Sequence, residues 1–143
     1  MAEQRRLWTF HGGLHLDDHK AESNGRAVQT LPLPTRLTLP LHQHIGLSAE
    51  PVVRPGDTVK KGQPVARATD YVSAPIHAPS SGRVIEIGPR PVPHPSGLSD
   101  TCIVIEPDGL DTWDELPPAM TDYTAHSDAD LRERIRWAGV VGL

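Results

Sequence analysis

The sequence has few of the residues on which several classes of protein depend. One cysteine, Cys102, is present in 143 residues. No disulfide can therefore form within the chain, and no cysteine-ligated zinc or iron–sulfur site can be built from it. A lone cysteine is typical of a reducing compartment, where thiols persist.

Long apolar runs and a strong charge of one sign are also missing. No run approaches the roughly 20 apolar residues of a membrane-spanning helix. The first ten residues, MAEQRRLWTF, lack the apolar core of a signal peptide. The net charge of −4 is small and of the wrong sign for a nucleic-acid footprint. We therefore expect a soluble chain that reaches a membrane only through partners.

Proline and glycine, by contrast, are abundant. The chain has 15 Pro and 12 Gly, while aromatic residues make up only 4% of it. The Pro and Gly content is well above an average of roughly 12%. This mixture favours a turn-rich β domain with extended loops over a helical bundle, and 143 residues suffice for one modest core.

The stretch 51–87 shows this organisation best. Short apolar segments alternate with turn sequences at 55–57 (PGD), 61–63 (KGQ) and 80–82 (SSG). Pro presets φ near −65° and Gly accepts positive φ, so each turn has a physical cause. Strands this short, with turns this close together, predict a small barrel or sandwich.

Two segments of this stretch resemble the hammerhead half-motifs of biotinyl and lipoyl domains, which are barrel-sandwich hybrids. They are PGDTVKKGQPVA at 55–66 and APSSGRVIEI at 78–87. Such domains carry their cofactor on a lysine at the tip of the central hairpin, which here falls at Asp70 and Tyr71. No lysine lies between Gln63 and Gly82, and the nearest, Lys61, is in the preceding turn. A carrier domain is therefore the disfavoured alternative.

The flanking regions predict two further strands. In 36–41 the residues Leu37, Leu39 and Leu41 alternate, as in a half-buried strand. Pro40 confines that strand to a sheet edge or makes it a strand end. The β-branched run 101–106 (TCIVIE) predicts a second strand, in which Cys102 packs as a small hydrophobe.

Residues 127–138 predict an amphipathic helix. Ser127 and Asp130 have the spacing of a capping box. Leu131, Ile135 and Ala138 share a face. We expect this apolar face to dock, either on the barrel or on a second copy. Trp113 and Tyr123 in the preceding acidic segment are expected to pin that segment to the barrel.

The proline-rich segment 88–97 predicts an interaction loop. Prolines at 89, 91, 93 and 95 disfavour a regular helix or a central strand. We expect a loop or inserted arm, and exposed loops of this kind often contact partners. Its interaction candidates are Pro91, Pro93, His94 and Pro95.

Histidines give the sequence's metal-site candidates. The candidates are His11, His15 and His19, spaced by four, and the pair His42 and His44. Neutral imidazole is a common metal ligand. Solvated histidines in an extended arm are the alternative for the first three, because Gly12 and Gly13 disfavour a helix there.

A chance catalytic triad is a further alternative. Ser80, His77 and Asp70 have the required side chains, but no nucleophile elbow is present. We predict no catalytic residue in this chain.

Longer segments, in order along nearly the whole chain, resemble one family. They are FHGGLHLDDHK (10–20), LPLPTRLTLPLHQHIG (31–46), PGDTVKKGQ (55–63), APIHAPSSGRV (74–84), CIVIEPDG (102–109) and AGVVGL (138–143). Together they resemble the N-terminal region of the C subunit of the Rnf (Rsx) ion-translocating electron transport complex. The resemblance implies a mainly β fold, a small barrel-sandwich hybrid with extended arms and one C-terminal α-helix.

The resemblance also implies a function and a set of partners. In that family AGVVGL leads into a flavin (FMN)- and NADH-binding domain, followed by two [4Fe–4S] clusters. The complex transfers electrons between NADH and ferredoxin, coupled to Na⁺ or H⁺ movement. The chain is then a fragment, a non-catalytic scaffold domain without a cofactor of its own. Its partners are the downstream domains and the other subunits, and its location is peripheral, on the cytoplasmic side of the bacterial inner membrane.

The expected domain organisation follows from these assignments. We expect an N-terminal arm (1–30), a barrel-sandwich hybrid (31–110) with the proline-rich loop 88–97, an acidic connector (111–126), and a helix with the start of the flavin domain (127–143).

Overall fold

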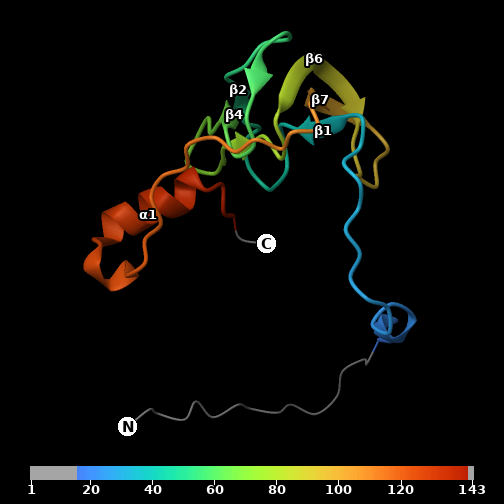
Figure 1. Cartoon of the computed structure of the whole chain (residues 1–143), viewed down its shortest axis with the longest axis horizontal. Helices are drawn as coiled ribbons and strands as arrows, with labels where there is room; N and C mark the ends of the chain where they lie inside the picture. Colours follow the sequence, from blue (N-terminus) through green and yellow to red (C-terminus); the bar gives the residue numbers. More distant parts are fainter. Residues whose placement is uncertain (1–15, 142–143) are drawn as a thin grey trace. The chain divides into compact units, whose positions relative to one another are not determined.

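The chain divides into two units, Met1–Leu31 and Pro32–Leu143. The computed structural model describes residues 16–141 of it (Figure 1). In the smaller unit, residues 20–22 form a 3-10 helix, η1 (Lys20–Glu22), and every described residue is exposed. The larger unit contains the strands and α1, and it holds every element discussed below apart from η1.

Two antiparallel sheets make up the β-structure of the larger unit. The four-stranded sheet has the order β1-β7-β6-β3, and the three-stranded sheet has the order β2-β4-β5. The strands are β1 (Leu37–Pro40), β2 (Glu50–Pro51), β3 (Thr58–Val59), β4 (Pro64–Arg67), β5 (Ile76–His77), β6 (Gly82–Pro91) and β7 (Ser99–Pro107). The mainly β class is as predicted, and β1 lies at a sheet edge, where Pro40 is tolerated.

The core is built from aliphatic side chains of both sheets. Its fully or nearly fully buried members include Val59, Val65, Val84, Ile103 and Ile105. The predicted strand at 101–106 is confirmed as β7, which pairs with β1 on one side and β6 on the other. Residues 102–105 of this central strand are all buried, and Ile103 and Ile105 belong to the core.

Two bulges change which residues face the core. In β6 the register with β7 shifts between Val84 and Glu86. In β4 the register with β5 shifts between Pro64 and Ala66. An extra residue at a bulge breaks strict alternation. This accounts for the consecutive burial of Val65 and Ala66.

The proline-rich segment is less of a loop than predicted. Strand β6 continues to Pro91, and Gly88 to Pro91 pair with Cys102 to Ser99 of β7. The prediction of a loop over 88–97 is therefore wrong for residues 88–91. Strand β3 pairs with β6 only opposite Gly82 and Arg83. The far end of β6 has one neighbouring strand in the sheet, and a proline on its free side loses no ladder hydrogen bond.

The C-terminal helix begins and ends as predicted. α1 (Asp128–Trp137) starts with a complete capping box between Ser127 and Asp130, and Gly139 follows it with φ +69°. Figure 1 shows α1 to one side of the strands rather than layered on a sheet. None of its residues is buried. The expected docking of the face with Leu131 and Ile135 is thus incomplete, since Ile135 is 53% exposed.

Candidate functional site

The hairpin tip between β4 and β5 is the position at which carrier domains bear their cofactor. Residues 70–72 form a bend and turn there. The Thr69 hydroxyl donates to the Ser48 carbonyl oxygen (2.9 Å), and the Thr69 amide donates to Ser73 Oγ (3.2 Å). These bonds hold the base of the tip, while Tyr71 projects into solvent. The tip has no amine to which a lipoyl or biotinyl group can be attached.

The nearest lysine is held in a different place. The Lys61 ammonium pairs with the Asp111 carboxylate and lies 4.7 Å from the centroid of the Trp113 ring. Lys61 N–H also donates to the Thr112 carbonyl oxygen, and Asp114 N–H donates to the Lys61 carbonyl oxygen, both at 2.9 Å. The lysine thus joins the segment 111–114 to the barrel. The ion pair also lowers the pKa of Asp111 below its ordinary value.

A second contact between this segment and the barrel centres on Ser81, whose hydroxyl donates to Asp108 Oδ1 and accepts from Thr112 N–H, both at 2.8 Å. The Leu110 amide donates to the same carboxylate, and the amide and Ser81 bonds lower the pKa of Asp108. Sequence reasoning placed 111–126 outside the barrel and missed these contacts.

Three candidate histidines lie around one groove. His42 and His44 line it from the bend after β1, and Pro93 and His94 line it from the hairpin loop between β6 and β7. Each Nδ1 atom faces a different neighbour: Asp100 Oδ2 at 3.9 Å from His42, the Ile45 carbonyl at 2.8 Å from His44, and Ser96 Oγ at 2.8 Å from His94. Pro91 ends β6, and Pro95 is exposed in the same loop.

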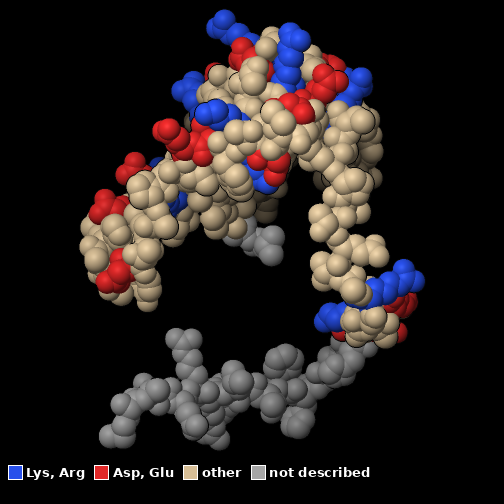
Figure 2. Space-filling view, in the orientation of Figure 1, with Lys and Arg blue, Asp and Glu red and all other residues tan. Residues whose placement is uncertain are grey.

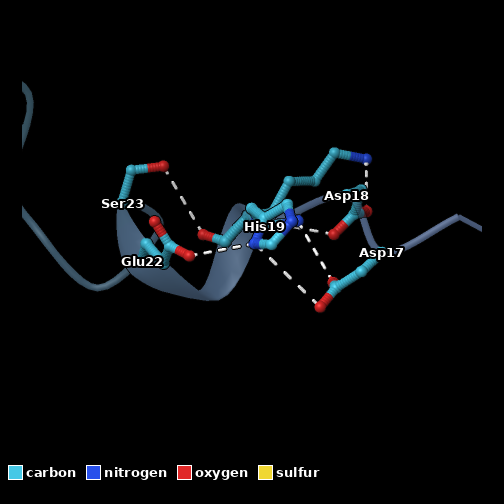
Figure 3. A network of polar contacts seen from close by, with 6 residues as sticks. Asp17, Asp18, His19, Glu22 and Ser23 are labelled. Atoms are coloured by element: carbon cyan, nitrogen blue, oxygen red, sulfur yellow. Dashed lines mark hydrogen bonds and ion pairs between the residues drawn. The ribbon is translucent and has the colours of Figure 1, made fainter.

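His19 belongs to the other unit and has its own neighbours. Its Nδ1 atom lies 3.0 Å from Glu22 Oε1, and its amide donates to Asp17 Oδ1 (3.2 Å), as Figure 3 shows. His11 and His15 lie outside the described residues. Over residues 16–141, no group of three or more His, Cys, Asp or Glu side chains is placed to hold a metal ion.

The residues of the hypothetical triad are not assembled. Among the described residues no hydrogen bond joins Asp70, His77 and Ser80. His77 packs edge-on against Trp137 and its Nε2 atom is buried without a partner, while Ser80 is buried beneath the surface. Burial lowers the pKa of His77. This imidazole belongs to the contact between α1 and the barrel.

A larger groove borders that contact. It is lined by residues 43–45, by the hairpin tip at 71–74, by Arg132, Ile135 and Arg136 of α1, and by residues 140–141. Its volume is about 1090 Å³. On the face shown in Figure 2, acidic and basic side chains are interspersed over the molecule, without a broad surface of one sign.

The single cysteine and the lengths of the helices bear on a role in electron transfer. Cys102 is fully buried, which raises the pKa of its thiol. A [4Fe–4S] cluster requires four cysteine ligands, so the residues of this chain do not fit one. Across residues 16–141, every helix is too short or too polar to cross a membrane.

Comparison with known proteins identifies the family. Residues 8–110 match the family model described as the RnfC barrel sandwich hybrid domain. The chain is also similar to proteins named as the C subunit of the ion-translocating oxidoreductase complex. It is 48% identical to that of Pseudomonas aeruginosa over 137 residues, 46% to that of Erwinia tasmaniensis over 138, and 44% to that of Vibrio cholerae over 138.

These matches include 96% of this chain but only 17–18% of each relative, in its N-terminal part. The chain thus spans under one fifth of the length of the curated relatives. The family match agrees with the two small sheets described above and with the resemblance found in the sequence. The chain belongs to the RnfC barrel sandwich hybrid domain family, and it corresponds to the N-terminal part of the C subunit of an ion-translocating oxidoreductase complex.

Proposed function

We propose that this chain is a non-catalytic scaffold domain in the NADH-side subunit of a membrane-bound electron transport complex. The complex would transfer electrons between NADH and ferredoxin, coupled to Na⁺ or H⁺ translocation. The observation that carries the proposal is the combination of family membership with a lysine-free hairpin tip. The barrel-sandwich fold is present, but the residue through which related folds act as carriers is absent.

The other components of the reaction would lie outside this chain. FMN, NADH and two [4Fe–4S] clusters would be bound by domains that follow in the same subunit, since one buried cysteine cannot ligate a cluster. The partners of this domain would be those downstream domains and the other subunits of the complex. Its location would be peripheral, on the cytoplasmic side of the bacterial inner membrane.

A titration of the purified chain with FMN and with NADH tests this proposal. Flavin fluorescence and calorimetry would be recorded for the 143-residue chain and for the longer subunit that carries it. We expect the chain to bind neither ligand and the longer subunit to bind both. Binding of either ligand by the chain with a dissociation constant in the micromolar range or tighter would contradict the proposal.

Mass spectrometry of the intact chain tests the carrier alternative on the same sample. A lipoyl or biotinyl group adds mass to the chain, whereas a scaffold domain has the mass of its sequence. We expect the unmodified mass after expression in a host that lipoylates and biotinylates its own carrier proteins. An added lipoyl or biotinyl mass would favour the carrier function.

A further inference from the structure

The groove beside α1 exposes apolar side chains from three separate parts of the chain. Ile45 is 90% exposed, Tyr71 83% and Val140 63%, and Val72 and Ile135 are each about half exposed. Ala74 alone among its lining residues is buried. Small-molecule sites enclose most of their ligand and present a few converging polar groups. A contiguous exposed apolar surface is instead typical of a protein contact.

We propose that this groove is the docking site for the polypeptide that follows residue 143 in the longer subunit. The inference rests on the proposed function, because it names the surface through which the scaffold would hold its downstream domain. It commits to an intramolecular occupant rather than to a second copy or to another subunit.

The course of the chain supports an intramolecular occupant. After α1 the backbone turns at Gly139, where a Cβ atom would lie 2.8 Å from the Pro75 carbonyl oxygen, so the turn is held against the barrel. Val140 and Val141 then line the groove. The matched part of each curated relative is its N-terminal 17–19%, so in those proteins most of the chain follows it.

Tethering makes a modest apolar surface sufficient for docking. A segment joined through a few residues to the edge of the groove has an effective concentration in the millimolar range. A separate protein would need a larger and better-packed interface to bind at cellular concentrations. The groove's lining is limited in extent and mostly exposed, which fits the tethered partner better.

The charges around the groove indicate the chemistry of the occupant. Arg136 lies over the Tyr71 ring, 5.7 Å from its centroid, and pairs with no carboxylate of the described residues. In the described part of the chain, Arg132 pairs with Asp128, at 4.0 Å on an exposed surface. Exposed pairs of this kind contribute little. We therefore expect an apolar segment flanked by Asp or Glu, whose carboxylates meet the two arginines.

Hydrogen exchange followed by mass spectrometry tests the proposal. The 143-residue chain is compared with the longer subunit that carries it. We expect amides in 43–47, 70–74 and 132–141 to exchange about tenfold more slowly in the longer subunit, because a docked segment opens rarely. Exchange in the loop 92–98, which does not line this groove, should be equal in the two. Equal exchange at the groove would overturn the proposal.

Paired variants in the longer subunit separate docking from a general stabilisation. Val72→Asp combined with Ile135→Asp places two carboxylates on the apolar lining and should abolish the protection at 43–47. Leu110→Asp alters another exposed apolar residue, 76% exposed and outside the groove, and should leave the protection unchanged. Melting of the two variants as 143-residue chains checks that the barrel remains folded, since all three side chains are about half exposed or more.

Other occupants give different results. Protection that grows with the concentration of the 143-residue chain alone would indicate a second copy. Protection that arises only when the other subunits are added would indicate one of them. Either result overturns the intramolecular proposal. Neither affects the scaffold function, whose own test is ligand binding by the chain: a chain that binds FMN refutes the scaffold even if the groove is protected.

Discussion

The imidazole of His77 lies edge-on against the indole of Trp137, with ring centroids 5.2 Å apart and an interplanar angle of 66°. This contact joins strand β5 to the last residue of α1. Nε2 of His77 is buried and has no hydrogen-bond partner within residues 16–141, and burial lowers the pKa of the ring. The helix thus contacts the barrel through an imidazole whose neutral form is favoured by burial.

Removing the indole should return His77 towards the behaviour of a solvated imidazole. In Trp137→Ala we expect the pKa of His77 to rise towards about 6.5, because the ring regains water. The wild-type pKa is lowered, so the unfolded chain binds more protons and stability falls as the pH drops below about 6.5. That fall should be smaller in the variant. NMR titration of the imidazole protons and urea unfolding between pH 5 and 8 measure the two effects.

Tyr123→Ala is the control for this pair. Tyr123 is 69% exposed, and the aromatic partner of His77 is Trp137. Its removal should leave the pKa of His77 unchanged. An equal change in both variants would mean that a general loosening, rather than the indole contact, sets the pKa.

Gly82 should tolerate a side chain poorly, because its backbone lies close to that of β7. A Cβ atom there would overlap the Glu106 carbonyl oxygen and lie 2.8 Å from Pro107 Cα, both backbone atoms of β7. Gly82→Ala should lower the free energy of unfolding by roughly 2 kcal/mol or more, because strands β6 and β7 must separate to admit the methyl group. Gly109→Ala, with φ +79° and nothing within 4 Å, should cost about 1–2 kcal/mol from backbone strain alone. Urea unfolding of both variants gives the comparison, and equal losses would contradict it.

The pair between Lys61 and Asp111 should contribute to stability only above acid pH. The pKa of Asp111 is lowered, chiefly by the lysine, so its contribution is present above about 3.9 and is lost as the pH falls through the folded-state value. Asp111→Asn should lower the urea midpoint at pH 6, and the difference from wild type should vanish near pH 2. A difference that persists at pH 2 would show that the amide disturbs the segment for another reason.

The capping box should stabilise α1 without stabilising the barrel. Ser127 Oγ accepts from the Asp130 amide at 3.2 Å, and Asp130 Oδ2 accepts from the Ser127 amide at 3.3 Å. Ser127→Ala should cost the helix about 1 kcal/mol. Because none of the helix residues is buried, we expect faster amide exchange in 128–137 with little change in the melting temperature of the sheets. A matching drop in that melting temperature would show the two parts to unfold together.

The sequence predicted elements whose causes are local. Pro40 indicated an edge strand, and β1 lies at the edge of its sheet. Ser127 and Asp130 indicated a helix start, and the reciprocal bonds are present. Trp113 packs against Gly62 and Lys61 as expected, but Tyr123 remains mostly exposed, so the prediction that it pins the connector is wrong.

Features that depend on distant partners were not visible in the sequence. Residues 88–91 contain two prolines, yet β7 provides a partner strand for them. The register shifts in β4 and β6 follow no residue pattern that the sequence analysis identified. The groove beside α1 combines residues 43–45, 71–74 and 132–141, which are far apart in the sequence, so no local motif marks it. The interaction role of Pro91, Pro93, His94 and Pro95, and the domain boundaries, stay predictions.

The connection between the barrel and residues 111–114 bears on what counts as one folding unit. The family match ends at residue 110, while Thr112 and Asp114 exchange backbone hydrogen bonds with Lys61 at the rim of the barrel. A protein trimmed to residues 8–110 would retain every strand and still lose these two backbone hydrogen bonds. The family match and the contacts of the barrel thus end at different residues, and a minimal stable form of the domain should include the few residues beyond the family match.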